Sequence, residues 1–478
     1  MPYRGRMPSE STYAVKQVSN VRLLAAGLVL LLNASCSSSS SVVSLGEAPK
    51  NVIIFIADGA GPAQITMARD YAEAVDGLKE LNLDPHQTGS VRTSSADSRI
   101  TDSAAGATAY SGGIKTYNGA IGVDTQKRPV ATLLEVAEEK GMVTGMVATS
   151  RITHATPASF SSHVPDRGME SEIAAQQIEQ GIEVIVGGGS DFFLPVSEGG
   201  HRTDGRNLLE EARGLNYQVV RDLQGFRGTG DVPVLALLSG DHLAYEVDRD
   251  PLQEPDLAEM TRKAIDLLDA TGRNFFLLVE GSRIDHASHG NDPIGTLHDV
   301  LAYDRAFKEA IEFARKDGET LVIAVADHET GGLSIGRSNP PETFAKALDA
   351  PTFWRSFEAE DQYDWNPEAI ARVENSTEVI ADKIDAGADA GAAMRELAGV
   401  DDLSAEEGAA LGAASVDGDL ARVVAEIVSR RAMIGWTTGG HTAVDVNLYT
   451  FGPGSYLFRG NIENDLVGRL LLDVLRRP

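Results

Sequence analysis

The chain has 478 residues, of which 42% are hydrophobic and 23% charged, and this composition excludes general disorder and allows a sizeable core. Its formal net charge of -28 argues against nucleic acid as a partner, because phosphate backbones require clustered lysine and arginine. The acidity is compatible with metal binding, since bound divalent cations can reverse the sign of an acidic pocket.

Residues 1–36 are predicted to be a targeting leader, with basic residues ahead of an apolar run at 23–32 that is too short to span a bilayer. The only cysteine, Cys36, precedes five serines, so the segment resembles a bacterial lipoprotein signal followed by a serine-rich tether at 37–47. We expect an exported protein, periplasmic or membrane-anchored through a lipid on Cys36. Simple cleavage after a small residue is the alternative. A lone cysteine allows no internal disulfide.

The body of the chain alternates apolar runs typical of buried parallel strands with helix-like stretches. The expected strands are residues 51–57, 142–150, 182–189, 275–281, 320–327 and 446–452, and the expected helices are residues 132–141, 171–181, 256–272, 297–318 and 461–477. This alternation predicts an α/β fold with a doubly wound, mostly parallel sheet flanked by helices. Residues 48–338 and 436–478 are expected to form this α/β domain, and residues 339–435, rich in alanine and acidic residues, a helical insertion.

Three of the expected strands end in carboxylates, namely Asp58, Glu280 and Asp327. A single carboxylate at such a position is more often a salt bridge or a helix cap, because a buried charge needs a partner. Ligands gather at the carboxyl ends of parallel strands. The three together therefore favour a ligand site at one edge of the sheet.

Histidines follow two of these carboxylates directly, in segments 280–289 and 327–332, and His441 lies in a third segment at 439–442. Asp285 and His289 are four residues apart, so one helical turn would place both on the same face. Mixed carboxylate and imidazole ligands suit zinc. The sequence therefore predicts a metal site.

The segment at 101–108 has an acidic residue and a serine, Asp102 and Ser103, ahead of small residues. This pattern is typical of a helix start, where free backbone N–H groups and the helix dipole favour an anion such as phosphate. Both residues could equally be simple caps. Ser103 becomes a useful nucleophile only if a base or a metal removes its proton.

Six motifs, taken in order, resemble those of the alkaline phosphatase family. They are IADGAGPAQ around Asp58, TDSAAGATA around Ser103, THATPASFSSHVPDR at 153–167, VEGSRIDHASH from Val279, ADHETGG from Ala326 and TTGGHTA from Thr437. The resemblance covers roughly residues 48–336 and 436–456 and does not extend to 339–435. It implies hydrolysis of phosphate monoesters through a phosphoserine intermediate at a site with two Zn²⁺ ions and one Mg²⁺ ion.

The resemblance also implies roles for individual residues. Ser103 would be the nucleophile, Arg167 would clamp the phosphate, and Asp102 could orient the Arg167 guanidinium. The implied metal ligands fall into three sets: Asp285, His289 and His441 for one zinc; Asp58, Asp327 and His328 for the other; and Asp58, Thr156 and Glu280 for magnesium.

The third metal position is where the chain departs from some bacterial relatives, which carry Asp at the place of His154 and Lys at the place of His286. Neutral imidazole prefers zinc or cobalt, whereas magnesium prefers hard oxygen ligands. Both histidines are therefore expected to weaken magnesium retention and to allow Co²⁺ in its place. The alternative is that they only hydrogen-bond to waters in the site.

The expected partners are small phosphate monoesters and a second copy of the chain in a homodimer, with no nucleic acid and no membrane contact beyond the lipid anchor. A phosphodiesterase or sulfatase could use similar metal ligands, but Arg167, Thr156 and Glu280 resemble the monoesterase pattern. A non-catalytic metal-dependent surface binder would not need Ser103 at a helix start.

Overall fold

The computed structural model describes residues 48–336 and 365–477. The predicted leader, the tether and Cys36 lie outside the described residues. Within these ranges, no helix is both long and apolar enough to cross a bilayer.

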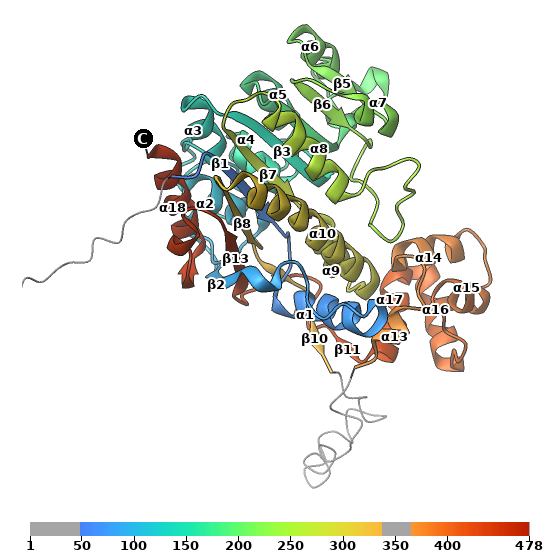
Figure 1. Ribbon diagram of the computed structural model, residues 1–478. Helices are drawn as coiled ribbons and strands as arrows, with labels where there is room; N and C mark the ends of the chain where they lie inside the picture. The colour runs from blue at the N-terminus through green and yellow to red at the C-terminus, as the bar shows by residue number, and fades with distance from the viewer. Residues whose placement is uncertain (1–47, 337–364, 478) are drawn as a thin grey trace, which may run out of the picture. The chain divides into compact units, whose positions relative to one another are not determined.

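A ten-stranded sheet forms the centre of the molecule, in the order β14, β2, β13, β8, β1, β7, β3, β4, β6, β5 (Figure 1). The strands are β1 (Asn51–Ile56), β2 (Gln87–Arg92), β3 (Val143–Arg151), β4 (Val184–Gly188), β5 (Gln218–Val220), β6 (Val234–Leu237), β7 (Phe275–Glu280), β8 (Thr320–Val325), β13 (Val446–Phe451) and β14 (Gly460–Glu463). Only β13 runs antiparallel to its neighbours β2 and β8 in this sheet.

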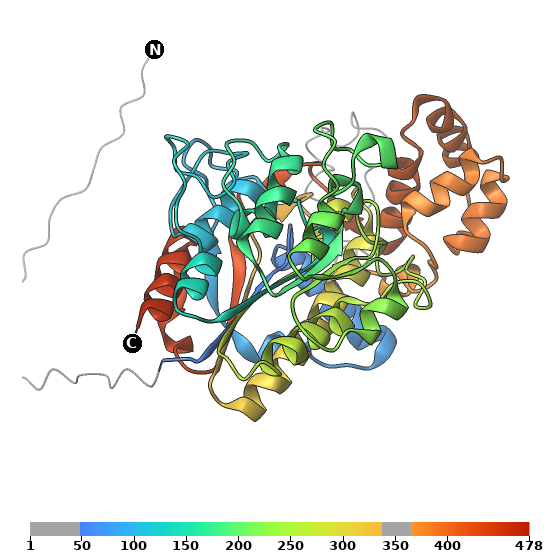
Figure 2. The same cartoon turned by 90° about the horizontal axis from the view of Figure 1, so that it is seen from above.

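Helices cover both faces of the sheet, as Figure 2 shows. One layer contains α1 (Pro62–Tyr71), α8 (Leu257–Asp269), α9 (Arg283–His289) and α10 (Pro293–Asp317); the other contains α2 (Ser103–Gly112), α3 (Leu133–Glu139), α4 (Ala155–Ser161) and α18 (Asn464–Arg476). Three further helices, α5 (Glu170–Gln180), α6 (Leu208–Gly214) and α7 (Leu223–Gly228), accompany β4, β5 and β6. The predicted doubly wound α/β fold is confirmed.

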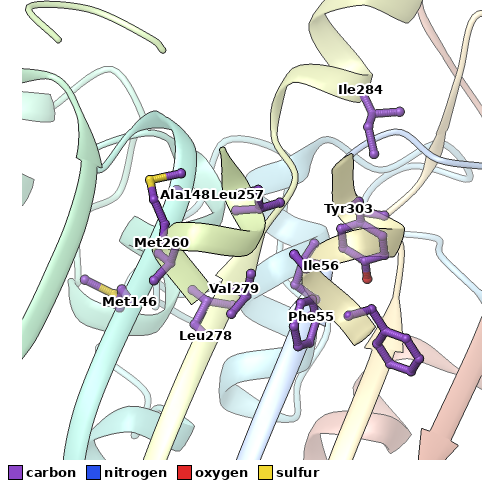
Figure 3. Close-up of a cluster of buried hydrophobic side chains, with 14 of the residues drawn as sticks. Phe55, Ile56, Met146, Ala148, Leu257, Met260, Leu278, Val279, Ile284 and Tyr303 are labelled. Carbon is purple, nitrogen blue, oxygen red and sulfur yellow. The ribbon is translucent and has the colours of Figure 1, made fainter. Parts of the chain in front are cut away.

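The central strands are buried on both faces, as their apolar sequences predict. All six residues of β1 are buried between β7 and β8, with Ile56 opposite Glu280 on one side and Val325 on the other. Apolar side chains from β1, β3, β7, α8 and α10 pack together in the core (Figure 3), where Phe55 contacts the ring of Tyr303 edge to face. This packing fixes the positions of the strand ends.

Five helices lie between residues 365 and 434: α13 (Pro367–Ile370), α14 (Thr377–Asp385), α15 (Ala390–Leu397), α16 (Ala405–Asp417) and α17 (Leu420–Ala432). The short strands β10 (Ser334–Ile335) and β11 (Ile434–Gly435) pair antiparallel on either side of this segment. The described part of this segment is therefore helical, as expected. Its boundaries at 339 and 435 stay a prediction, as do the other domain limits.

The expected helix over 461–477 is wrong in its first turn. Gly460–Glu463 is the edge strand β14, which pairs parallel with β2, and α18 begins at Asn464. A four-residue strand has too few residues for its alternation to outweigh the strong helical pattern that follows. The short strands β5 and β6, at the other edge of the sheet, were not expected either.

Candidate active site

Three carboxylates lie together at the carboxyl ends of neighbouring strands. Asp58 follows β1, Glu280 ends β7 and Asp327 follows β8, and all three side chains are fully buried. Because β1 lies between β7 and β8, the strand order alone brings their ends side by side. The three carboxylates therefore converge at the carboxyl ends of these strands, and the ligand site expected there stays a prediction.

The first ligand cluster consists of Asp58, Asp327 and His328, whose ligand atoms lie within 4.8 Å of one another. His328 Nε2 lies 3.6 Å from Asp58 Oδ1 and 3.3 Å from Asp327 Oδ2. Both oxygens of Asp58 and Oδ2 of Asp327 are buried without a hydrogen-bond partner. Buried carboxylate oxygens are rarely left unsatisfied, so these atoms fit a bound cation.

The second cluster brings together Asp285, His289 and His441 from separate parts of the chain. His289 Nε2 lies 3.3 Å from Asp285 Oδ2 and 3.1 Å from His441 Nε2, and His441 Nε2 lies 3.7 Å from Asp285 Oδ1. His441 reaches the site because β12 (His441–Thr442) pairs with β9 (Glu329–Thr330), which directly follows His328. The rings of His441 and His328 stack with their centroids 3.5 Å apart, so the two clusters adjoin.

Close approach of the backbone helps to form this second cluster. Gly59, in the turn after β1, has a φ of +75°, and a β-carbon there would lie 2.8 Å from the Cα of Asp285. Only glycine suits both requirements. The start of α9 can therefore approach the end of β1 closely enough to bring Asp285 to the site.

The third group consists of Asp58, Glu280 and His154, whose ligand atoms also lie within 4.8 Å of one another. Thr156 lies next to it at the start of α4. Glu280 Oε1, Thr156 Oγ1 and His154 Nδ1 are buried and have no hydrogen-bond partner. The sequence placed His154 beside this position; in the structure its ring is one of the possible ligands.

The charges of the site fit cations as well. Burial, followed by the charges of Asp327, Asp285 and Glu280, raises the pKa of Asp58 well above its usual value. Burial also raises the pKa of Glu280 to about 7 and that of Asp327 to about 8. So many buried like charges repel one another unless positive charge lies among them.

In contrast to these three carboxylates, Asp285 has a lowered pKa, because it pairs with His289. Burial opposes ionisation of Asp285, but its hydrogen bond with His289 and the nearby imidazoles hold its pKa well below the usual value. The same hydrogen bond to Asp285 raises the pKa of His289 to about 9. A bound cation could take the place of the proton shared by this pair.

Ser103 is the first residue of α2 and points at the first cluster. Its Oγ lies 3.1 Å from His328 Nε2, and its side chain is almost fully buried. The small residues of α2 allow this approach, because Gly106 lies against Asp327. Tyr110, further along α2, donates its hydroxyl to the carbonyl of Ala326 at 2.8 Å and ties the helix to the end of β8.

Asp102 is both a helix cap and a partner of Arg167. The sequence had left these two roles as alternatives. Asp102 Oδ1 accepts a hydrogen bond from the Ala105 N–H at 2.9 Å, and Oδ2 accepts one from Arg167 Nη1 at 3.1 Å. Arg167 Nη2 lies 3.1 Å from His154 Nε2. The guanidinium is therefore held between the start of α2 and His154 of the third group.

Sequence reasoning missed two contributors to the site. His242 packs its ring 4.4 Å from that of His286 and 5.6 Å from that of His154, measured between centroids. Burial, followed by His286 and Arg151, lowers the pKa of His242 to about 2. Thr330 donates its hydroxyl to Asp285. Thr330 lies within the ADHETGG motif, which could have identified it as a site residue. His242 lies in a loop outside every motif, so nothing in the sequence indicated it.

Comparison with known proteins gives one consistent result. The family model described as "Alkaline phosphatase" matches residues 49–476. The repressible alkaline phosphatase of Saccharomyces cerevisiae is 37% identical, over 99% of this chain and 89% of the yeast protein. The crystal structure of a cold-active alkaline phosphatase from a psychrophilic Shewanella species superposes with a TM-score of 0.78 at 30% identity, covering 89% of this chain and all of the other.

A third relative bears on the magnesium position. A His-to-Asp mutant of the alkaline phosphatase from the Antarctic bacterium TAB5, solved with Mg bound in its M3 site, is 28% identical, with a TM-score of 0.63 over 90% of this chain and 99% of that one.

Proposed function

This chain belongs to the alkaline phosphatase family and is a phosphatase, and from that membership we propose that it hydrolyses phosphate monoesters through a covalent phosphoserine on Ser103. The observation that supports the proposal most directly is the position of the Ser103 hydroxyl, 3.1 Å from His328, at the start of a helix and beside two groups of unsatisfied carboxylates. A hydroxyl placed there lies next to the charges that would activate it.

The proposed ligands are those expected from the sequence. One Zn²⁺ would be held by Asp285, His289 and His441, the other by Asp58, Asp327 and His328, and Mg²⁺ by Asp58, Thr156 and Glu280. When bound, these ions would supply Lewis acidity that lowers the pKa of the serine hydroxyl and of a water, and would stabilise the oxygen that departs.

Ser103 then carries the reaction in two steps. Its Oγ forms a bond to phosphorus as the bond from phosphorus to the ester oxygen breaks, and the alcohol leaves with a proton. A water next attacks the phosphoserine, the Oγ–P bond breaks, and inorganic phosphate departs while Ser103 regains its hydroxyl proton. The helix start favours the phosphoryl group in both steps, because backbone N–H groups and the dipole stabilise anions there.

Arg167 would bind the phosphoryl oxygens that take no part in bond exchange. A guanidinium presents planar paired donors that match two phosphate oxygens. Asp102 forms an ion pair with one side of this guanidinium. Arg167 therefore loses less conformational freedom when it binds the phosphate. This arrangement favours a monoester over a diester, since a diester has fewer free oxygens.

The experiment that tests the proposal compares the purified, metal-loaded protein on an aryl phosphate monoester, an aryl phosphodiester and an aryl sulfate. We expect the highest kcat/KM on the monoester by a wide margin. A higher value on the diester or the sulfate would contradict the proposal and support a sister activity of the same superfamily. Absence of turnover on all three would support the non-catalytic binder.

The remaining expectations are proposals of the same kind. Export with a lipid on Cys36 predicts that Cys36→Ser turns a membrane-bound protein into a released one; unchanged partition into detergent would contradict it. A homodimer predicts twice the chain mass by sedimentation. Magnesium bound in the TAB5 mutant supports the use of that metal at a corresponding site here, and His154 and His286 beside it would favour cobalt or zinc.

A further inference from the structure

A cavity of about 420 Å³ opens beside the candidate active site, between the end of α9 and the start of α17. Figure 1 shows α17 next to the start of α10, which follows α9 directly. The cavity is lined by His289, a candidate metal ligand, and by Asn291, Glu378, Asp419 and Arg422 among others. Its volume lies within the range of about 300–1,000 Å³ that small-molecule sites occupy.

Two opposite charges of this cavity have no partner among the residues that the structure describes. Asp419 and Arg422 are exposed residues three apart at the start of α17, and neither side chain makes a hydrogen bond or an ion pair with any group in the described ranges. Side chains spaced in this way on a helix often pair with each other. Here they do not pair, and both line this cavity as well as the larger one beside it.

The other charged groups of the cavity are already engaged. Glu378 accepts a hydrogen bond from the Tyr245 hydroxyl at 3.2 Å. Asp292 accepts hydrogen bonds from the backbone N–H groups of Ile294 and Thr377, and its side chain is fully buried. His289 Nδ1 is hydrogen-bonded to the Gly439 carbonyl. Asp419 and Arg422 are therefore the charges free to bind a ligand.

We propose that this cavity receives the leaving group of O-phosphorylated hydroxy amino acids, with Arg422 at the carboxylate and Asp419 at the ammonium group. An amino acid is a small zwitterion that matches an unpaired guanidinium and an unpaired carboxylate at the same time. The inference rests on the proposed function: Ser103 lies beside His328, so in-line displacement places the departing oxygen on the opposite side, toward Asp285 and His289. Hydrolysis then releases the free amino acid and inorganic phosphate.

Four small phosphate monoesters that differ in these two charges test the inference. O-Phosphoserine carries both groups, O-phosphoethanolamine only the ammonium, 3-phosphoglycerate only the carboxylate, and glycerol 3-phosphate neither. The test measures kcat/KM for all four with the metal-loaded wild type, Arg422→Gln and Asp419→Asn. The matched control is Arg395→Gln, which removes an exposed charge from α15 that lines neither this cavity nor the larger one next to it.

Arg422→Gln should lower kcat/KM roughly two- to fivefold on O-phosphoserine and 3-phosphoglycerate, the size expected for one charged contact at a partly exposed place. It should leave the other two substrates unchanged. Asp419→Asn should instead lower kcat/KM on O-phosphoserine and O-phosphoethanolamine. Arg395→Gln should change none of the four.

Equal effects of a variant on all four substrates, or no effect on any, would overturn the inference while glycerol 3-phosphate turnover still upheld the proposed function. If the wild type hydrolysed none of the four, the proposed function would fail, and this inference with it.

Discussion

Ser103 Oγ and His328 Nε2 lie 3.1 Å apart, although the two residues are 225 positions apart in the chain. Ser103 begins α2, while His328 follows β8, so the contact joins a helix of one layer to the carboxyl end of a central strand. Burial, followed by the charge of the His441 imidazole, lowers the pKa of His328 well below its usual value. A neutral imidazole in this place is available as a metal ligand rather than as a proton donor.

Ser103→Ala should lower turnover of a phosphate monoester by at least about a thousandfold, because the nucleophile is lost. Zinc content should be unchanged, because no ligand of either proposed zinc is altered. The measurements are kcat on an aryl phosphate and metal content by elemental analysis. Wild-type protein quenched in acid with labelled substrate should carry phosphate on Ser103, and unlabelled protein would refute the covalent mechanism.

Arg167→Ala should weaken inhibition by inorganic phosphate roughly ten- to a hundredfold, the loss expected for a charged, paired hydrogen bond. Monoester turnover should fall more than diester turnover. Arg167→Lys is the control, since it keeps the charge but not the planar pair of donors, and it should fall between the wild type and alanine. Equal losses on both substrates would show that Arg167 has no clamping role.

The strand ends explain why so much of the site could be predicted from the sequence. Asp58, Glu280 and Asp327 each end an unmistakable apolar run, and a parallel sheet brings such ends to one edge. The contact between His289 and His441 is different. It depends on the pairing of β12 with β9, two strands of two residues each, which no hydrophobic pattern signals.

His242 and Asp419 show where sequence reasoning stops. His242 comes from a loop after β6 and joins the third metal group only because of the tertiary packing. Asp419 and Arg422 look like ordinary surface residues of an amphipathic helix. Only the position of α17 beside the end of α9 makes them neighbours of the candidate site.

Glu138 on α3 should make stability depend on pH. Burial, together with the charges of Glu183 and Glu135, raises the pKa of Glu138 to about 7 from an ordinary 4.5, although hydrogen bonds from Thr144 and Gln180 oppose the change. Between these two pH values the folded state keeps a proton that the unfolded state has released. The free energy of unfolding therefore falls as pH rises through this window.

Glu138→Gln removes this dependence. The variant should be more stable than the wild type by about 1–2 kcal/mol at pH 8, a figure that allows for the partial exposure of Glu138, and the gain should vanish toward pH 5. Denaturant unfolding of both proteins in saturating metal at several pH values measures it, since the metal contribution cancels in the difference. The control Glu139→Gln changes the exposed neighbour and should give no pH-dependent gain. A gain that is constant with pH would contradict the titration of Glu138.

His154 should decide how tightly the third position holds magnesium. Burial, and next the charge of Arg167, lowers the pKa of His154 well below its usual value, so the ring is neutral and offers Mg²⁺ a nitrogen where it prefers oxygen. We expect the purified enzyme to lose activity on dialysis and to regain it with millimolar-scale magnesium or with cobalt. His154→Asp adds a carboxylate next to Asp58 and Glu280 and should tighten magnesium binding by about tenfold.

Calorimetric titration of Mg²⁺ into zinc-loaded wild type and His154→Asp gives the two affinities directly. His201→Asp is the matched control, because it makes the same change at an exposed histidine that packs on Phe192, and it should leave magnesium affinity unchanged. Arg167 Nη2 lies 3.1 Å from His154 Nε2, so the new carboxylate should also attract the guanidinium and alter inhibition by phosphate. If the wild type and His154→Asp bind magnesium equally well, ligand softness does not govern this position, and His154 and His286 only hydrogen-bond to waters there.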